Sequence, residues 1–208
     1  MLFRSETNAH PHTSCCKKIA VVHNGIIENY KEIKEELIAK GHVFSSQTDT
    51  ETIAHLIEEN LKEYPLLADA VRQSLKQIKG AFALGIVYED DPELLIAARK
   101  SAPLIIGLGE NENFIASDVP ALLEFTKKVI YLDDEEIAEI KNNNVLITDF
   151  EGKIKNKKFE ILPWEPVALS KMGFKHYMLK EIHEQPDVIR QTLSGRLISI
   201  DKPIKLNE

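Results

Sequence analysis

The chain has 208 residues, of which 43% are hydrophobic and 28% charged, a composition typical of a globular protein with an ordinary core. It carries 33 acidic and 26 basic residues, and the formal net charge of -7 argues against an electrostatic nucleic-acid binder. No apolar run approaches the ~20 residues that span a bilayer, so we expect no membrane segment. The two cysteines, Cys15 and Cys16, are adjacent and form no disulfide framework, which favours a reducing, cytoplasmic setting.

The stretch IAVVHNGIIEN joins a short apolar run to a polar tripeptide and then to a periodic segment. The apolar run Ile19–Val22 predicts a buried strand, and the segment Ile26–Lys40 predicts an amphipathic helix with mixed-sign charges on its outer side. We therefore interpret His23-Asn24-Gly25 as a turn between the strand and the helix.

This tripeptide is also a candidate for stabilising negative charge. Asn24 offers a side-chain amide donor, and Gly25, which lacks a Cβ, can adopt a positive φ and let a substrate approach its backbone N–H. A side-chain amide and a backbone N–H aimed at one point are the parts of an oxyanion hole. The alternative is an ordinary Asn-Gly turn, which the dipeptide alone favours.

Two more helices are expected before residue 80. The segment His42–Ser45 reads as a short strand, and Thr48 then opens a helix in which Glu51 completes a capping box. Asp49 lies in the first turn of that helix, where its charge suits the helix dipole. The segment Leu67–Ile78 predicts the next helix.

After Gly80 the pattern changes to short apolar runs separated by turn clusters, which predicts antiparallel strands and an α+β fold. The expected strands are Ala81–Tyr88, Leu94–Ala98, Leu104–Leu108, Phe114–Ala116, Val129–Leu132, Ile137–Ile140 and Val145–Thr148. Val119–Phe125 reads as a short helix capped by Ser117 or Asp118, and the charge run Lys153–Lys158 reads as a solvated hairpin.

The last quarter of the chain begins with a proline-rich interruption. Pro163-Trp-Glu-Pro166 predicts a linker or a domain edge, and Tyr177–Ser194 predicts a helix that Pro186 kinks or breaks.

Several strings carry a family resemblance together. They are HNGIIENY, SSQTDTETIAHL (Ser45–Leu56), NAHPH (Asn8–His12), PLIIGLG (Pro103–Gly109), NFIASD (Asn113–Asp118) and HYMLKEIHEQP (His176–Pro186). With them the chain, from Asn8 onward, resembles the glutaminase domain of the class II glutamine amidotransferases. The continuation IIEN and the HYMLKEIHEQP tail are similar to one branch, the glutamine–fructose-6-phosphate aminotransferases (isomerizing).

The resemblance implies an Ntn-hydrolase-like four-layer sandwich, in which two antiparallel sheets lie between helices, incomplete at the N-terminus. Residues 1–165 would form a partial, N-terminally truncated glutaminase domain. Residues 166–208 would form the linker and the start of the sugar-isomerase half.

The implied activity is transfer of the amide nitrogen of glutamine to fructose 6-phosphate, giving glucosamine 6-phosphate and glutamate, the first committed step of amino-sugar synthesis in the hexosamine pathway. Asn24 and Gly25 would stabilise the oxyanion, and Asp49 would receive the α-ammonium group of glutamine. His10 would be a hydrogen-bonded residue near the glutamine pocket. The resemblance implies no metal and no organic cofactor, and a homodimer for the full-length enzyme.

The family nucleophile is an N-terminal cysteine whose own amine acts as the base, and this sequence does not supply one. Cys15 and Cys16 lie too close to the strand that leads to His23 to replace it. We therefore expect the chain alone to be inactive, and an ammonia-release assay tests this. A lone His10 and His12 pair is weak evidence for a metal site.

Two alternatives remain open from the sequence. The chain can be a fragment of another class II amidotransferase, such as amidophosphoribosyltransferase or asparagine synthetase, or it can be a non-catalytic, glutamine-binding regulatory module.

Overall fold

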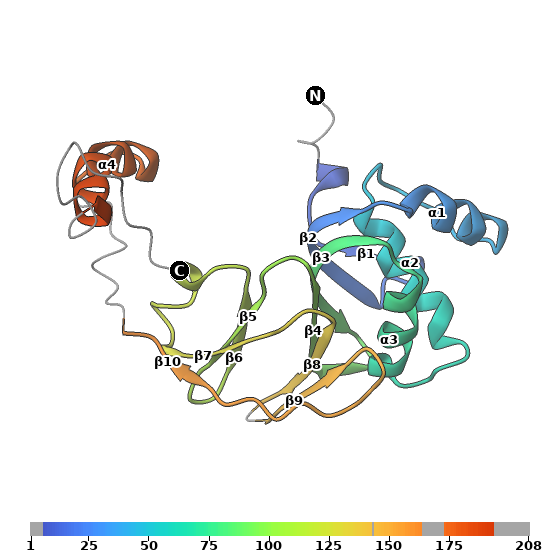
Figure 1. Cartoon of the computed structure of the whole chain (residues 1–208). Helices are drawn as coiled ribbons and strands as arrows, with labels where there is room; N and C mark the ends of the chain where they lie inside the picture. Colours follow the sequence, from blue (N-terminus) through green and yellow to red (C-terminus); the bar gives the residue numbers. More distant parts are fainter. Residues whose placement is uncertain (1–5, 143, 164–172, 194–208) are drawn as a thin grey trace. The chain divides into compact units, whose positions relative to one another are not determined.

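The structure is a computed structural model that describes residues 6–142, 144–163 and 173–193. The chain divides into two compact units, residues 1–164 and 165–208, and each is treated by itself. The first unit contains three helices and two antiparallel sheets (Figure 1). The helices are α1 (Tyr30–Ala39), α2 (Thr50–Leu61) and α3 (Leu67–Gln77).

The larger sheet has six strands and the smaller sheet has four, and every paired neighbour runs antiparallel. In spatial order the larger sheet contains β1 (His12–Thr13), β2 (Ile19–Ile27), β3 (Gly80–Tyr88), β4 (Asp91–Lys100), β8 (Glu136–Lys141) and β9 (Asn144–Asp149). The smaller sheet contains β10 (Glu160–Ile161), β7 (Lys128–Tyr131), β5 (Ile105–Leu108) and β6 (Asn113–Ala116).

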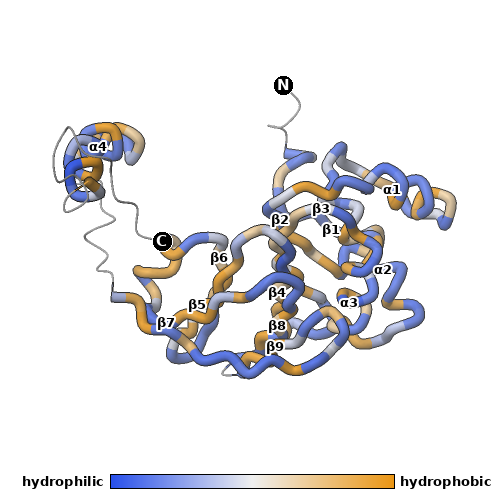
Figure 2. The backbone as a smooth tube through the Cα atoms, viewed as in Figure 1, coloured by the Kyte–Doolittle hydropathy of each residue, from blue (hydrophilic) through white to orange (hydrophobic). Residues whose placement is uncertain are grey.

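Side-chain alternation along the strands produces two separate cores. Phe82 and Leu84 of β3 belong to a cluster shared with α1, α2 and α3, whereas Ala83 between them belongs to a cluster shared with β5 and β7. The helices therefore cover one face of the larger sheet, and the smaller sheet covers the other. In Figure 2, the orange colour of hydrophobic residues runs along β5 and β8.

Small residues on the face between the sheets let the two layers approach closely. A Cβ placed on Gly85 of β3 would lie 2.5 Å from the Cδ1 of Ile115 in β6 and 2.9 Å from the Cγ2 of Val22 in β2. The two sheets therefore meet at Gly85 of β3, beside Val22 of β2 and against Ile115 of β6.

The α+β class and all seven strands expected after Gly80 are confirmed. Two local predictions are wrong: His42–Ser45 forms no strand, and the expected helix at Val119–Phe125 is a 3₁₀ turn over Val119–Ala121. Asp118 caps that turn by accepting a hydrogen bond from the Val119 N–H at 2.8 Å. The charge run Lys153–Lys158 is largely exposed, and its Ile154 folds back onto β9 in an antiparallel bridge with Thr148, as expected of a solvated hairpin. The first unit also contains a 3₁₀ turn at Glu6–Asn8.

The predicted turn at His23-Asn24-Gly25 is also wrong, because β2 continues through all three residues to Ile27. Each of them pairs with β3, and Asn24 lies opposite Ala83. The helix consequently begins at Tyr30 rather than at Ile26. The partner strand β3 is remote in sequence, with Gly80 opposite Ile27 at the nearest pair and Tyr88 opposite Ile19 at the farthest, so local periodicity does not reveal these pairings.

The capping box at the start of α2 is not formed. The helix begins at Thr50, with Asp49 as the residue before it, and the Glu51 carboxylate bonds to the preceding loop instead of to Thr48. That carboxylate accepts hydrogen bonds at 2.6–2.8 Å from the backbone N–H and hydroxyl groups of Ser45 and Ser46.

The described part of the second unit is residues 173–193, which contain α4 (Tyr177–Leu193). The helix runs continuously through Pro186, so of the two expected outcomes, a kink or a break, the break is absent. The expected domain boundary at residues 165 and 166, and the end of the predicted helix at Ser194, lie outside the described residues. Among the helices of the described segments, none has the length and apolar character needed to cross a membrane.

Candidate functional site

Asn24 lies at a cavity between the two sheets. The cavity has a volume of about 180 Å³ and is lined by Val22, His23, Asn24, Ala83, Leu84, Gly85, Leu104, Ile115, Ala116 and Ser117. Alternation along β2 directs Asn24 to the same face as Val22, toward the smaller sheet. The exposed side chain of Asn24 is therefore a polar group beside a mainly apolar hollow.

Gly25 follows in the same strand with a φ of +144°, a conformation that residues with side chains rarely adopt. A Cβ at this position would overlap the carbonyl oxygen of Ala81 and lie 2.8 Å from the Cα of Phe82. The positive φ expected from the sequence is confirmed. The structure adds a second reason for glycine, which is the close approach of β3.

The backbone N–H of Gly25 points to an open edge of the sheet. β1 pairs with β2 only at Ala20 and Val21, so no described strand covers that side of β2 beyond Val21. The Ile27 N–H, on that side, donates to the Oδ2 of Asp49 at 2.8 Å. Because N–H groups two residues apart in a strand point the same way, the Gly25 N–H faces this edge as well.

Asp49 is thereby held beside the end of β2. It is half-buried, and its Oδ2 is engaged by Ile27, whereas no hydrogen bond to its Oδ1 is found within residues 6–142, 144–163 and 173–193. The structure thus brings Asn24, Gly25 and Asp49 to the C-terminal end of β2. Asn24 and Gly25 are adjacent, and Asp49 is joined to the residue two positions after Gly25.

Three histidines surround the start of α2, and each is bonded to a threonine hydroxyl. His23 Nδ1 lies 3.0 Å and His10 Nε2 lies 3.2 Å from the Oγ1 of Thr50, and His12 Nε2 lies 3.1 Å from the Oγ1 of Thr48. His10 is therefore hydrogen-bonded, as expected.

The two more buried rings of this group favour their neutral forms. Burial lowers the pKa of His12 and of His23, although the nearby Asp49 carboxylate opposes the effect at both residues. The lowered pKa values of His12 and His23 favour neutral rings at these two positions, which leaves the Asp49 carboxylate available to a cationic group.

Glu51 fixes the loop that leads into the site. Burial raises the pKa of its carboxyl group, but the hydrogen bonds from Ser45 and Ser46 outweigh burial and lower the pKa to about 2. Glu51 is therefore ionised at neutral pH and holds the residues just before Asp49 in place.

The cysteines lie in the loop between β1 and β2, and Cys15 contacts another part of α2. Both are free and exposed, and the Sγ of Cys15 lies 3.3 Å from the Nδ1 of His55. His55 follows Asp49 by six residues, which is about 9 Å along a helix. Cys15 therefore contacts the middle of α2 rather than the end that carries Asp49.

Sequence reasoning missed His23, Thr50 and Ser117 as neighbours of the site. These residues reach the site only because strands distant in sequence pair with each other and because α2 contacts β2. Continued strand alternation through His23 would have placed its side chain on the helix-facing side of β2. The interpretation of His23-Asn24-Gly25 as a turn excluded that prediction.

Known proteins resemble this chain in sequence and in fold. A family model described as "Glutamine amidotransferase domain" matches residues 2–124, a match that begins before Asn8. The glutamine–fructose-6-phosphate aminotransferase (isomerizing) of Aquifex aeolicus is 51% identical over 205 residues, which are 98% of this chain and 34% of that protein. The protein of the same name from Pyrococcus horikoshii is 48% identical over 203 residues, which are 97% of this chain and 34% of that protein.

The chain thus spans about a third of the length of the curated relatives it matches. Among solved structures, a glutamine phosphoribosylpyrophosphate amidotransferase from B. subtilis superimposes with a TM-score of 0.60 at 28% identity, covering 72% of this chain and 33% of that one. An allosteric regulatory enzyme of purine biosynthesis gives the same TM-score at 27% identity, covering 69% of this chain and 31% of that one. The two sheets and their helices have the Ntn-hydrolase arrangement, and the chain belongs to the glutamine amidotransferase domain family.

Proposed function

We propose that this chain contributes the glutamine site of an enzyme that transfers the amide nitrogen of glutamine to fructose 6-phosphate. Identity of 48–51% to proteins named for that reaction, over 97–98% of the chain, supports this choice over the other amidotransferases. Fructose 6-phosphate, a homodimer and a cytoplasmic setting belong to the proposal for the whole enzyme. The single observation that carries the proposal is the open edge of β2, where Gly25 follows Asn24 and precedes by two residues the Ile27 N–H that is bonded to Asp49.

The proposed chemistry assigns one task to each of the three groups. When a thiolate attacks the side-chain amide carbon of glutamine, the C=O electron pair moves onto the oxygen and creates an oxyanion. The Gly25 N–H and the Asn24 amide donate hydrogen bonds to this oxygen, and each such donor is worth about 3 kcal/mol in other enzymes.

Asp49 binds the other end of the substrate. Its Oδ2 is held by the Ile27 N–H, so its Oδ1 is directed to the α-ammonium group of glutamine in a charge-assisted hydrogen bond. The neutral histidines around it compete little for this charge, because burial lowers the pKa of His12 and His23.

Calorimetric titration of the purified chain with L-glutamine tests the proposal. We expect saturable binding that Asp49→Asn weakens by about tenfold or more, because a charge-assisted pair becomes neutral. Asp90→Asn is the matched control. Asp90 lies in the turn between β3 and β4 and is ion-paired with Lys18 at 2.8 Å, so this variant should bind glutamine as tightly as wild type does. Absence of binding, or equal binding by Asp49→Asn, would overturn the assignment.

A further inference from the structure

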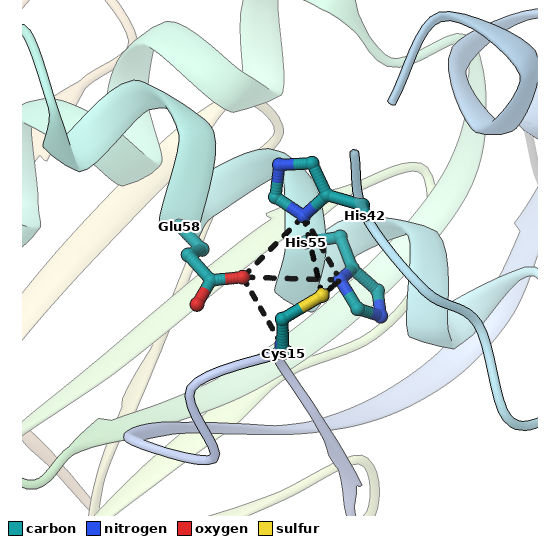
Figure 3. Close-up of side chains that lie close together, drawn as sticks. All are labelled: Cys15, His42, His55 and Glu58. Carbon is teal, nitrogen blue, oxygen red and sulfur yellow. Dashed lines mark hydrogen bonds and ion pairs between the residues drawn. The ribbon is translucent and has the colours of Figure 1, made fainter. Parts of the chain in front are cut away.

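Four potential metal ligands gather beside the middle of α2 (Figure 3). Cys15 comes from the loop between β1 and β2, His42 from the segment between α1 and α2, and His55 and Glu58 from α2 itself. His55 and Glu58 are three residues apart, so they share one face of the helix. One atom from each residue lies within 4.8 Å of the others.

Five of the separations are close to those of a tetrahedral zinc centre. Zinc bonds of 2.0–2.1 Å to nitrogen and about 2.3 Å to sulfur place two nitrogens about 3.3 Å apart, and sulfur and nitrogen about 3.5 Å apart. The Nδ1 atoms of His42 and His55 are 3.2 Å apart. The Sγ of Cys15 lies 3.6 Å from the first and 3.3 Å from the second. The Oε2 of Glu58 lies 3.4 and 3.8 Å from the same two nitrogens.

A carboxylate stands behind each imidazole. The Nε2 of His42 is hydrogen-bonded to the Oε2 of Glu59 at 3.0 Å, whereas the Nε2 of His55 lies 3.5 Å from the Oε1 of Glu51 without a hydrogen bond to it. A carboxylate on one ring nitrogen keeps the proton there and leaves the other nitrogen as a lone pair, which is the usual support of a metal-binding histidine. Both lone pairs would then be on the Nδ1 atoms that face each other.

Two lone pairs at this distance repel unless a proton or a cation lies between them. Both rings are buried, so water has little access to the two nitrogens. A proton on one Nδ1 satisfies the two rings alone, whereas a divalent cation satisfies both nitrogens and also gives the Cys15 thiolate and the Glu58 carboxylate a common partner.

We propose that Cys15, His42, His55 and Glu58 bind one zinc ion. A set of one thiolate, two imidazoles and one carboxylate suits zinc, which takes sulfur, nitrogen and oxygen ligands in a tetrahedron. Binding releases the Cys15 thiol proton to solvent, because the thiolate is the ligand. Four protein ligands complete the coordination, so the ion is structural and ties the β1–β2 loop and the segment after α1 to α2.

Ordinary hydrogen bonds already join part of this cluster. Glu58 accepts the Cys15 and Cys16 N–H groups at 3.0 and 2.8 Å, and the Cys15 sulfur accepts the Val43 N–H at 3.3 Å. These contacts position the loop, but they do not explain why two imidazole nitrogens converge on the same point. A network without metal is therefore the competing outcome of the test.

Cobalt substitution provides a direct readout. The full chain is freed of metal, titrated with Co²⁺ and followed by absorption, because a thiolate ligand gives a charge-transfer band and a tetrahedral centre gives intense visible bands. Zinc should then displace cobalt at one equivalent per chain. Cys15→Ser should lose the charge-transfer band, whereas Cys16→Ser should keep it, since Cys16 is the adjacent thiol outside the ligand set.

A milder substitution outside the four ligands separates loss of zinc binding from loss of folding. Glu59→Gln replaces the carboxylate behind His42, with loss of its surface ion pairs to Lys40 and Lys62, and should weaken zinc binding by about 10–100-fold with an unchanged circular dichroism spectrum. The proposal is overturned if wild type takes up no zinc, if Cys15→Ser retains the cobalt–thiolate band, or if Glu59→Gln binds zinc as tightly as wild type.

Discussion

The Oδ2 of Asp49 accepts a hydrogen bond from the backbone N–H of Ile27 at 2.8 Å, so the start of α2 is fastened to the open edge of β2. This contact joins a helix N-terminus, where negative charge is favourable, to a strand end that still has an outward N–H at Gly25. Asp49 therefore has a structural role through one oxygen and a proposed substrate role through the other.

Two substitutions of Asp49 separate these roles. Asp49→Ala removes the acceptor of the Ile27 N–H and should lower the free energy of unfolding by about 1–2 kcal/mol. Asp49→Asn keeps an acceptor oxygen and should stay within about 0.5 kcal/mol of wild type, while both variants lose glutamine affinity. Urea denaturation measures the first effect and calorimetry the second; equal stability of the Ala and Asn variants would contradict the structural role.

Gly25→Ala should be severely destabilising. The new Cβ would overlap the Ala81 carbonyl oxygen in a backbone with a φ of +144°, so we expect a loss of about 3 kcal/mol or more in the free energy of unfolding. Gly41→Ala is the matched control, because Gly41 also has a positive φ, +96°, but a Cβ there meets nothing within 4 Å. That variant should lose only about 1–2 kcal/mol by denaturant unfolding. Similar losses in both variants would show that contact with β3 is not the reason for glycine.

Asn24→Ala should affect catalysis far more than stability. Asn24 is exposed, so we expect a change within about 0.5 kcal/mol in the free energy of unfolding. In a form of the enzyme that turns over glutamine, loss of one oxyanion donor should lower kcat by about 10²–10³-fold with little change in KM. The exposed Asn111 is the control, and Asn111→Ala should leave kcat unchanged. A larger change in KM than in kcat for Asn24→Ala would point to ground-state binding instead.

Acid should destabilise the fold through Glu51. Its pKa is lowered from 4.5 to about 2 in the folded protein, so its contribution is fully present above pH 4.5 and is lost as the pH falls toward 2. The shift corresponds to about 3 kcal/mol. Glu51→Gln should remove this part of the pH dependence, which denaturant unfolding between pH 2 and 6 would measure. If the free energy of unfolding of that variant still falls as steeply between pH 6 and pH 2, other carboxylates cause the loss of stability in acid.

The strands after Gly80 could be predicted because turn clusters separate apolar runs and each run forms one strand. The end of β2 could not, since His23, Asn24 and Gly25 are drawn into the sheet by residues of β3 that are remote in sequence. Glu51 shows the same limit, because its spacing from Thr48 fits a capping box, yet two serine hydroxyls and two N–H groups of the preceding loop bind it better.

The site was accessible from sequence only where its residues are contiguous or carry a family signature. Asn24 and Gly25 are neighbours, and Asp49 lies in a recognisable string. The cluster of Cys15, His42 and His55 has no compact motif, because three separate segments supply it. Its one local signal is the His55–Glu58 spacing on a helix, which many exposed helices share.

The most direct test of the central claim is a ¹H–¹⁵N correlation spectrum of the labelled chain during titration with L-glutamine. If the open edge of β2 binds the substrate, the backbone amide of Gly25 and the side-chain amide of Asn24 shift together along one saturable curve, and Asp49→Asn weakens both shifts. If both resonances stay fixed while glutamine binds, the oxyanion-stabilising role assigned to Asn24 and Gly25 is contradicted.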